Sequence, residues 1–296
     1  MSEAREASYL DRLANRSAAT GTVLCLGLDP DPDALPAGFS RDLRGVEAFA
    51  RLVLDAAGPV SAAVKPNLAF FEAFGSAGIA ALERLRAAIP AGLPVVIDAK
   101  RGDIGSTAAR QAVALFDGLA ADAITVSPYL GEEAIAPLLA RPGRFAYVLC
   151  RTSNPGAAEL QGLVVAADPA LGAPAEPLWA RVARRAAGWG PGATVGLVVG
   201  ATAPAELVAI RRLAPGLAFL VPGVGAQGGD ETAVLAGGRA TEAPAGGRPG
   251  GGLLVNVSRG IAGAAVARPG GTAAIDPGEA IAAAAREWAA RLPVLP

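Results

Sequence analysis

The stretch PVVIDAKRGD at residues 94–103 is a short apolar run that ends abruptly in charged residues. A near-continuous apolar run rich in β-branched residues is typical of a parallel strand that is buried on both faces. The third run of the chain, Pro94–Ile97, is therefore expected to form such a strand. Seven further runs have the same character, and they cover residues 22–28, 60–64, 123–126, 145–149, 194–199, 218–221 and 253–257.

Segments with helical spacing separate these runs. We expect helices over Ala7–Ala18, Val46–Ala57, Phe71–Ala88, Gly105–Leu119, Pro177–Ala187, Pro204–Leu213 and Pro277–Leu292. A strand followed by a helix, repeated eight times, favours a (β/α)8 TIM barrel over a doubly wound open sheet. The prediction is an α/β protein in which residues 1–296 form a single barrel domain.

One segment departs from this alternation. Residues 236–252 read AGGRATEAPAGGRPGGG, without periodicity or core-forming residues. A glycine-rich composition of this kind is typical of a flexible chain. We expect residues 236–252 to form a mobile surface insertion that precedes the eighth strand. Whether the neighbouring loops close over a ligand is a question that the sequence does not answer.

Composition excludes several classes of protein. The formal net charge is −1, from 26 basic and 27 acidic residues, so no global basic field attracts nucleic acid or anionic lipid. No run approaches the roughly 18 apolar residues that span a bilayer. The N-terminus, residues 1–6, carries acidic residues where a secretory signal is basic, so we expect an unprocessed cytoplasmic chain.

The chain contains no histidine, and Lys65 and Lys100 are its only lysines among 26 basic residues. Zinc sites built on imidazole and Ser-His or Cys-His nucleophiles are thereby excluded. Arginine replaces lysine wherever a solvated positive charge is enough. The two retained lysines therefore indicate positions that need a compact ammonium group, such as a proton donor or a tightly packed charge.

Active sites of such barrels lie at the C-terminal ends of the strands, where the third run supplies charged residues. Strand alternation places Asp98 and Lys100 on one face, about 6 to 7 Å apart. A lysine beside a carboxylate keeps its proton and can deliver it to a carbanion. Asp103 follows Gly102 with the opposite parity, so it is available to a neighbouring subunit. The structural alternatives are an Asp98–Lys100 ion pair and Asp103 as a helix N-cap.

The ends of the seventh and eighth runs predict a phosphate site. Glycines in the stretch PGVGAQGGD at 222–230 permit close backbone approach, and Gln227 can donate from its amide. Arg259 can bind a phosphate with two parallel hydrogen bonds. The hydroxyl of Ser153 is suited to the polar edge of a planar heterocycle. Asp29 is suited either to capping a loop or to accepting hydrogen bonds from a sugar.

The stretch VIDAKRGDIGST at residues 96–107 resembles the signature of orotidine 5'-phosphate decarboxylase, in its longer bacterial branch. The resemblance extends in order over nearly the whole chain. The further matching stretches are GLDP at 27–30, KPN at 65–67, SPYLG at 127–131, TSNPG at 152–156, PGVGAQGGD at 222–230 and NVSRG at 256–260.

This resemblance implies a homodimer that converts orotidine 5'-monophosphate to UMP and CO2 without metal or organic cofactor. Lys100 is then the residue that protonates C6, and Asp98 lies against the substrate carboxylate. Lys65 and Asp103 complete an alternating charge array. The implied substrate ligands are Asp29 and Thr107 for the ribose, Ser153 for the pyrimidine, and Gln227 and Arg259 for the phosphate. Asp103 and Thr107 are contributed across the dimer interface.

Two alternatives stay open at this point. A phosphosugar decarboxylase or aldolase of the same barrel superfamily shares the D-x-K-x-x-D pattern but requires Mg2+. The Arg101-Gly102 pair and the TSNPG turn favour the nucleotide enzyme. A non-catalytic phosphate-binding barrel retains Arg259 and the glycines but needs neither lysine.

Overall fold

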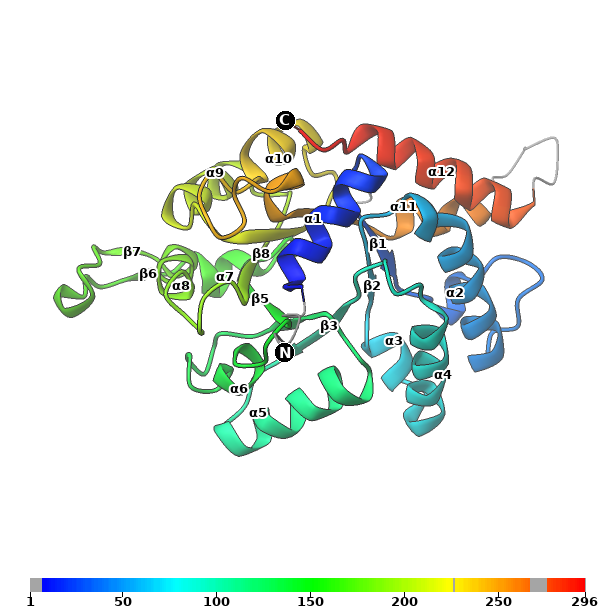
Figure 1. The fold of residues 1–296 in the computed structure, drawn as a ribbon, viewed down its shortest axis with the longest axis horizontal. Coiled ribbons are helices and arrows are strands. Elements are labelled where there is room, and N and C mark those ends of the chain that lie inside the picture. The colour runs from blue at the N-terminus through cyan, green and yellow to red at the C-terminus, as the bar shows by residue number, and fades with distance from the viewer. Residues whose placement is uncertain (1–6, 226, 267–275, 296) are drawn as a thin grey trace, which may run out of the picture.

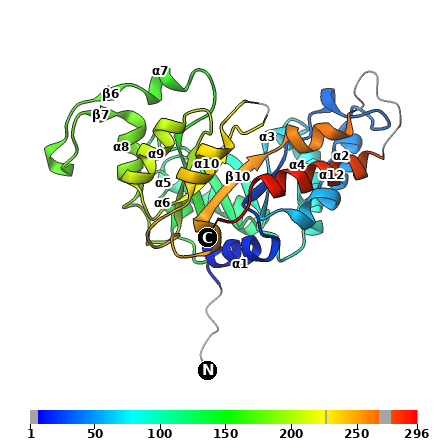
Figure 2. The ribbon, with the colours of Figure 1, turned by 90° about the horizontal axis from the view of Figure 1, so that it is seen from above.

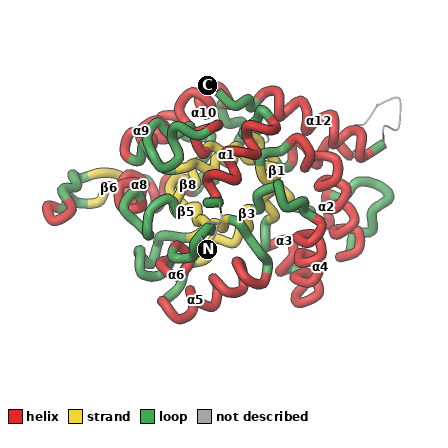
Figure 3. The backbone as a smooth tube through the Cα atoms, viewed as in Figure 1, coloured by secondary structure: helices red, strands yellow, loops and turns green. Residues whose placement is uncertain are grey.

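The computed structural model describes residues 7–225, 227–266 and 276–295. Residues 1–6, which carry the expectation of an unprocessed chain, and Ala226 of the predicted phosphate loop lie outside these ranges. Within the described part, a ring of parallel strands is surrounded by helices (Figure 3). The strands of the ring are β1 (Leu24–Leu28), β2 (Ala63–Pro66), β3 (Val96–Arg101), β4 (Ala123–Val126), β5 (Phe145–Arg151), β8 (Val195–Val199), β9 (Ala218–Pro222) and β10 (Leu253–Val257).

The ring closes into a barrel. The order of hydrogen-bonded neighbours is β2-β1-β10-β9-β8-β5-β4-β3, and every pairing along it is parallel. The two outer strands, β2 and β3, meet through isolated parallel bridges from Val64 to Val95 and from Asn67 to Asp98. Each of the eight predicted runs contains or overlaps a strand of this ring, so the predicted (β/α)8 barrel is confirmed.

The helices follow the predicted alternation. They are α1 (Tyr9–Thr20), α2 (Leu43–Ala57), α3 (Ala69–Glu72), α4 (Gly75–Ala88), α5 (Gly105–Ala112), α6 (Ala136–Leu139), α7 (Ala157–Gln161), α8 (Leu178–Ala186), α9 (Pro204–Leu213), α10 (Glu231–Gly238), α11 (Arg259–Ala262) and α12 (Pro277–Arg291). The helix predicted over 71–88 is divided between α3 and α4. The one predicted over 105–119 continues beyond α5 as a π-helix, Val113–Gly118.

Helix α1 closes the end of the barrel at which the strands begin (Figures 1 and 2). It starts where the Ser8 side chain accepts a hydrogen bond from the backbone of Asp11, and it ends at Gly21 in the left-handed conformation. Its Tyr9 ring stacks on Phe145 of β5 with centroids 4.8 Å apart. We call this end of the molecule the base of the barrel. Its apolar side chains form a cluster inside the barrel that is separate from the larger core between the strands and the outer helices.

Toward the other end of the barrel, the residues that point inward become polar. In four of the strands the change occurs over two residues, from Ala63 to Lys65 in β2, from Val96 to Asp98 in β3, from Ala123 to Thr125 in β4 and from Leu254 to Asn256 in β10. The same alternation that fills the base with apolar side chains therefore lines the mouth with polar ones.

The structure corrects one expectation about the glycine-rich segment 236–252. Ala240 and Ala245 are buried and join the cluster inside the barrel, and the Arg248 guanidinium binds the Asp11 carboxylate of α1 at 2.9 Å. The prediction that this segment lacks core-forming residues is wrong, because alanine is small enough to fill the space beside α1 without any periodic pattern. The segment packs at the base, and its mobility stays a prediction.

An antiparallel hairpin lies outside the barrel, between β5 and α8. Its strands are β6 (Val164–Val165) and β7 (Glu176–Pro177), and it extends away from the body of the molecule (Figures 1 and 2). Glu176 anchors the hairpin by binding Arg181 and Arg184 of α8 at 2.8 and 3.0 Å. Two-residue strands are too short to show periodicity, so sequence analysis did not predict them.

Candidate active site

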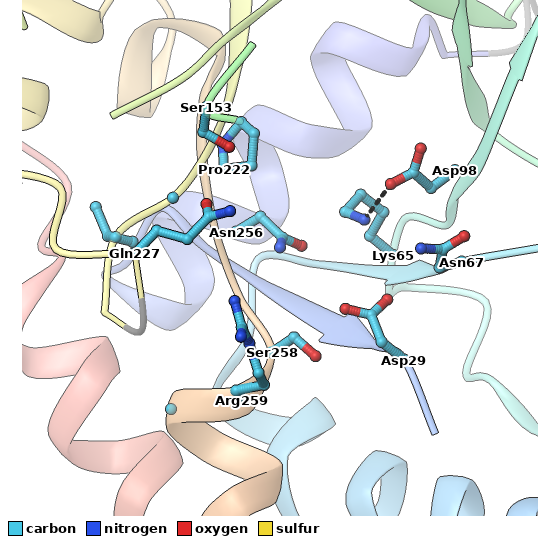
Figure 4. A pocket seen from close by; sticks show the side chains of 13 residues that line it. Asp29, Lys65, Asn67, Asp98, Ser153, Pro222, Gln227, Asn256, Ser258 and Arg259 are labelled. Carbon is cyan, nitrogen blue, oxygen red and sulfur yellow. Dashed lines mark hydrogen bonds and ion pairs between the residues drawn. The ribbon is translucent and has the colours of Figure 1, made fainter. Parts of the chain in front are cut away.

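A cavity opens at the C-terminal ends of the barrel strands (Figure 4). Six of the predicted site residues line it, and these are Asp29, Lys65, Asp98, Ser153, Gln227 and Arg259. Three polar residues to which sequence analysis assigned no role line it as well, namely Asn67, Asn256 and Ser258. Asn67 directly follows β2, Asn256 lies near the end of β10 and Ser258 directly follows that strand. Their position at strand ends was the signal that could have identified them.

Asp98 joins the two lysines of the chain. Lys65 Nζ donates to Asp98 Oδ2 and Lys100 Nζ donates to Asp98 Oδ1, with a donor–acceptor distance of 2.6 Å in each case. The Lys65 side chain is 5% exposed, whereas that of Lys100 is 51% exposed and extends from the mouth. The predicted pairing of Asp98 with Lys100 is thus present, and it extends to a buried second lysine.

The opposite charges of Asp98 and the two lysines offset the desolvation cost of burying them. Burial alone raises the pKa of Asp98, but the ammonium groups of Lys65 and Lys100 outweigh it and hold that pKa far below its ordinary value. Burial likewise acts to lower the pKa of Lys65, and the carboxylates of Asp98 and Asp29 reverse this effect and raise it. Asp98 and Lys65 are therefore both ionised at neutral pH, in a site where an unpaired charge is costly.

Lys100 reaches Asp98 by a route that differs from the predicted regular strand. Its φ of 47° lies in the left-handed region, which is uncommon for a residue with a side chain. The register between β3 and β4 also shifts between Ile97 and Arg101. The same-face prediction holds for the side chains, but an irregular strand brings them together, because regular alternation does not persist through Lys100.

Two glycines let the loop after β5 approach the cavity. A Cβ on Gly200 would come within 2.7 Å of the Ser153 backbone nitrogen. Gly223 has a φ of +103°, and a Cβ there would lie 3.0 Å from both the Ser153 Cβ and the Gln227 Oε1. Side chains at these positions would displace Ser153 and Gln227, so the glycines after β8 and β9 determine how closely the two loops meet.

Several groups that line the cavity have unused hydrogen-bonding capacity. Across residues 7–225, 227–266 and 276–295, the exposed Arg259 guanidinium has no hydrogen bond or ion pair. Buried oxygens of Asp29 and Asn256, both Oδ1, also have no partner among the described residues. Unpaired polar atoms that face a cavity are suited to binding a polar ligand.

Lys100, Asp103 and Thr107 are not among the residues that line this cavity, although Lys100 contacts its wall through Asp98. The Asp103 Oδ1 accepts a hydrogen bond of 2.7 Å from the backbone nitrogen of Ile104, and Ile104, not Asp103, occupies the N-cap position of α5. Thr107 lies on the exposed part of α5. Within one chain, the predicted constellation therefore includes Lys100 only through Asp98 and is incomplete at Asp103 and Thr107.

Among residues 7–225, 227–266 and 276–295, no group of three or more His, Cys, Asp or Glu side chains is arranged to hold a metal ion. None of the helices in those ranges combines the length and apolarity that crossing a bilayer requires.

Comparison with known proteins gives a consistent result. The sequence model of the family described as "Orotidine 5'-phosphate decarboxylase / HUMPS family" matches residues 22–273. The orotidine 5'-phosphate decarboxylase of Thermomicrobium roseum is 47% identical over 256 residues, which are 86% of each chain. That of Roseiflexus sp. is 44% identical over 270 residues, covering 91% of this chain and 90% of the relative. The solved structure of Leishmania donovani OMP decarboxylase superposes with a TM-score of 0.77 at 39% identity, covering 96% of this chain and 97% of that one.

The family match spans all eight strands of the barrel, and the curated relatives align over most of their own length. The chain belongs to the orotidine 5'-phosphate decarboxylase family, and it is a carboxy-lyase that converts orotidine 5'-monophosphate to UMP and CO2 in pyrimidine nucleotide biosynthesis.

Proposed function

We propose that this reaction proceeds through a carbanion at C6 of the pyrimidine, which Lys100 protonates. The observation that carries the proposal is the pair of 2.6 Å contacts that hold Lys65 and Lys100 on different oxygens of Asp98. Lys100 is the more exposed of the two lysines and lies near the C-terminal end of β3. Lys65 lines the cavity and binds the other oxygen of Asp98.

In the proposed step, the bond between C6 and the carboxylate carbon breaks, and its electron pair stays on C6 as CO2 leaves. An N–H bond of the Lys100 ammonium then breaks, and its proton forms the new C6–H bond of UMP. Lys100 is left neutral and regains a proton from solvent. No oxidant or reductant is consumed.

The charge cluster supplies the stabilisation that this step needs. A carbanion at C6 has little resonance relief, so the main contribution must come from charges that are in place before the reaction begins. Asp98 lies against the substrate carboxylate in this proposal, and its negative charge favours the loss of that carboxylate as neutral CO2. The ammonium of Lys100 stabilises the negative charge that develops at C6.

The other predicted site residues bind the substrate in this proposal. We assign the ribose to Asp29 and Thr107, the pyrimidine to Ser153, and the phosphate to Gln227 and Arg259. Asp29 Oδ1 has no partner among the described residues, which supports the first assignment, since it can accept a hydrogen bond from a sugar hydroxyl. The Arg259 guanidinium likewise has no partner in the part of the chain that the structure describes, which supports the last, because it can form two charge-assisted hydrogen bonds with phosphate oxygens.

A homodimer completes the site in this proposal, with Asp103 and Thr107 contributed from a second copy of the chain. Exposed apolar side chains lie on the loops that follow β3 and β4. Ile104 is 62% exposed, Tyr129 76% and Leu130 54%. The two loops are held together by a hydrogen bond from the Asp103 nitrogen to the Ala134 oxygen. Large apolar side chains exposed in one region favour burial against another protein surface.

The assay that tests the proposal is the loss of orotidine 5'-monophosphate absorbance, measured with and without EDTA. We expect equal rates, because the proposed steps use no metal or organic cofactor. A rate that falls with EDTA and returns with Mg2+ would favour the mechanism of the Mg2+-dependent phosphosugar enzymes. A cytoplasmic location and membership of the longer bacterial branch stay predictions.

A further inference from the structure

Strand β3 contains an irregularity opposite a single residue of β4. Ile97 pairs with Ile124, and the next pair joins Arg101 to Val126. Three residues of β3, from Asp98 to Lys100, therefore stand opposite Thr125 alone. Extra residues on one strand form a β-bulge, which redirects side chains and leaves backbone groups without their ladder partners.

The hydroxyl of Thr125 takes the place of those partners. Its Oγ1 accepts hydrogen bonds from the backbone nitrogens of Ala99 and Lys100, both at a distance of 3.0 Å. It donates to Asp98 Oδ1 at a distance of 2.9 Å. A hydroxyl has one donor and two acceptor positions, so this single group uses its full capacity on the three bulged residues. Thr125 is only 2% exposed and does not line the cavity.

These contacts join the backbone of the bulge to the charge cluster. Asp98 Oδ1 receives both the Thr125 hydroxyl and the Lys100 ammonium. Lys100 also has the left-handed φ of 47°, a conformation that persists only where surrounding contacts hold it. Thr125 is the described residue that contacts both ends of this arrangement, the Lys100 backbone and the Asp98 carboxylate.

We propose that Thr125 is a positioning residue for the decarboxylation, which holds the Asp98 carboxylate and the Lys100 backbone in the geometry that the proton transfer requires. The proposal rests on the roles assigned above to Asp98 and Lys100. Thr125 acts through these residues and touches neither substrate nor product. A hydroxyl, not merely a side chain of this size, is what the position needs.

The experiment compares Thr125→Val with Thr125→Ser. Valine keeps the shape but cannot accept from the two N–H groups or donate to Asp98, whereas serine keeps the hydroxyl. Thr22→Val is the matched control, because Thr22 is also buried and its hydroxyl also bonds backbone groups, donating to the Leu292 oxygen at 2.6 Å and accepting from the Leu24 nitrogen at 3.1 Å. It lies at the base of the barrel, away from the cavity.

For each variant we would measure kcat, KM, the Kd of UMP by calorimetry, and Tm. Exchange of the C6 hydrogen of UMP for deuterium, followed by NMR, reports the proton transfer without CO2 release. We expect Thr125→Val to lower kcat and the exchange rate by roughly 10- to 100-fold, since small displacements of reacting groups have effects of this size. KM and the Kd of UMP should stay within about threefold of the native values.

Thr125→Ser should restore kcat to within about threefold, and Thr22→Val should lower Tm while leaving kcat and exchange unchanged. The inference is overturned if Thr125→Val keeps native kcat, if serine fails to rescue it, or if Thr22→Val lowers kcat equally. Lys100→Ala separates this inference from the mechanism on which it rests. If Lys100→Ala is inactive and Thr125→Val is not, only the role of Thr125 fails, whereas an active Lys100→Ala removes the proposed mechanism itself.

Discussion

At the base of the barrel the inward-facing side chains are apolar, whereas at the mouth they are polar or charged. Tyr9, Phe145 and Tyr147 belong to the base and are at most 1% exposed. Within β2 and β3, only two residues separate apolar positions of the base from Lys65 and Asp98, which bind each other at the mouth. The same strands support both regions, so a difference in side chains alone separates a structural end from a reactive end.

This contrast teaches that stability and activity depend on different layers of one barrel. Burying the aromatic rings removes apolar surface from water and favours folding directly. Burying ionised groups has a large desolvation cost, which the contacts of Lys65 and Lys100 with Asp98 offset. Changes at the mouth should therefore alter turnover more than folding, and changes at the base should do the reverse.

The largest effect is expected from Lys100, the proposed proton donor. Lys100→Ala should abolish turnover while far-UV circular dichroism and Tm show a folded barrel. Lys100→Arg should be nearly as damaging, because a guanidinium is too wide and too weak an acid to replace an ammonium here. Near-native activity of the arginine variant would contradict the assignment.

Variants of Asp103 test whether the active site of one chain is completed by a residue of a second chain. Asp103→Ala and Lys100→Ala should each be inactive alone. Mixed under conditions of subunit exchange, they should form heterodimers with one intact site, and random exchange of equal amounts would restore about a quarter of the native sites. Activity is measured after mixing, and exchange is verified by mass spectrometry of tagged chains. Demonstrated exchange without recovery would place Asp103 in the site of its own subunit.

Sequence patterns predicted the layers of the barrel better than its irregular positions. Apolar runs located all eight strands, because burial on both faces leaves a strong compositional signal. The scarcity of lysine pointed to Lys65 and Lys100, which the structure brings together at Asp98, while their catalytic roles stay predictions. The bulge at Lys100 was not predictable, since it depends on Thr125 of a neighbouring strand, and no local pattern records a contact of that kind. For the same reason, the burial of Ala240 in a glycine-rich segment was missed.

Arg259 should show a smaller effect, confined to substrates that carry a phosphate. Removing one partner of a charge-assisted pair typically costs about 1.5 to 3 kcal/mol, so Arg259→Ala should lower kcat/KM for the nucleotide by at least tenfold. The nucleoside orotidine, which lacks the phosphate, should lose almost none of its already poor turnover. Arg286→Ala on the exposed surface of α12 is the matched control and should change neither. An equal fractional loss on both substrates would mean that Arg259 supports the barrel or the charge cluster instead.

The smallest effect on turnover is expected at the base, where the hydroxyls of Tyr9 and Tyr147 lie 3.1 Å apart. Burial raises the pKa of both tyrosines, so they remain neutral hydroxyls across the working pH range. Tyr9→Phe or Tyr147→Phe alone should lower the free energy of unfolding by about 1 to 3 kcal/mol, because the other hydroxyl is left buried without its partner. The double variant should cost less than the sum of the two, since it removes both polar groups.

Urea denaturation measures these costs, and kcat should stay native in all three variants because neither ring lines the cavity. Strictly additive costs would show that the two hydroxyls are not coupled, and a loss of kcat in a fully folded variant would show that the base and the mouth are not independent.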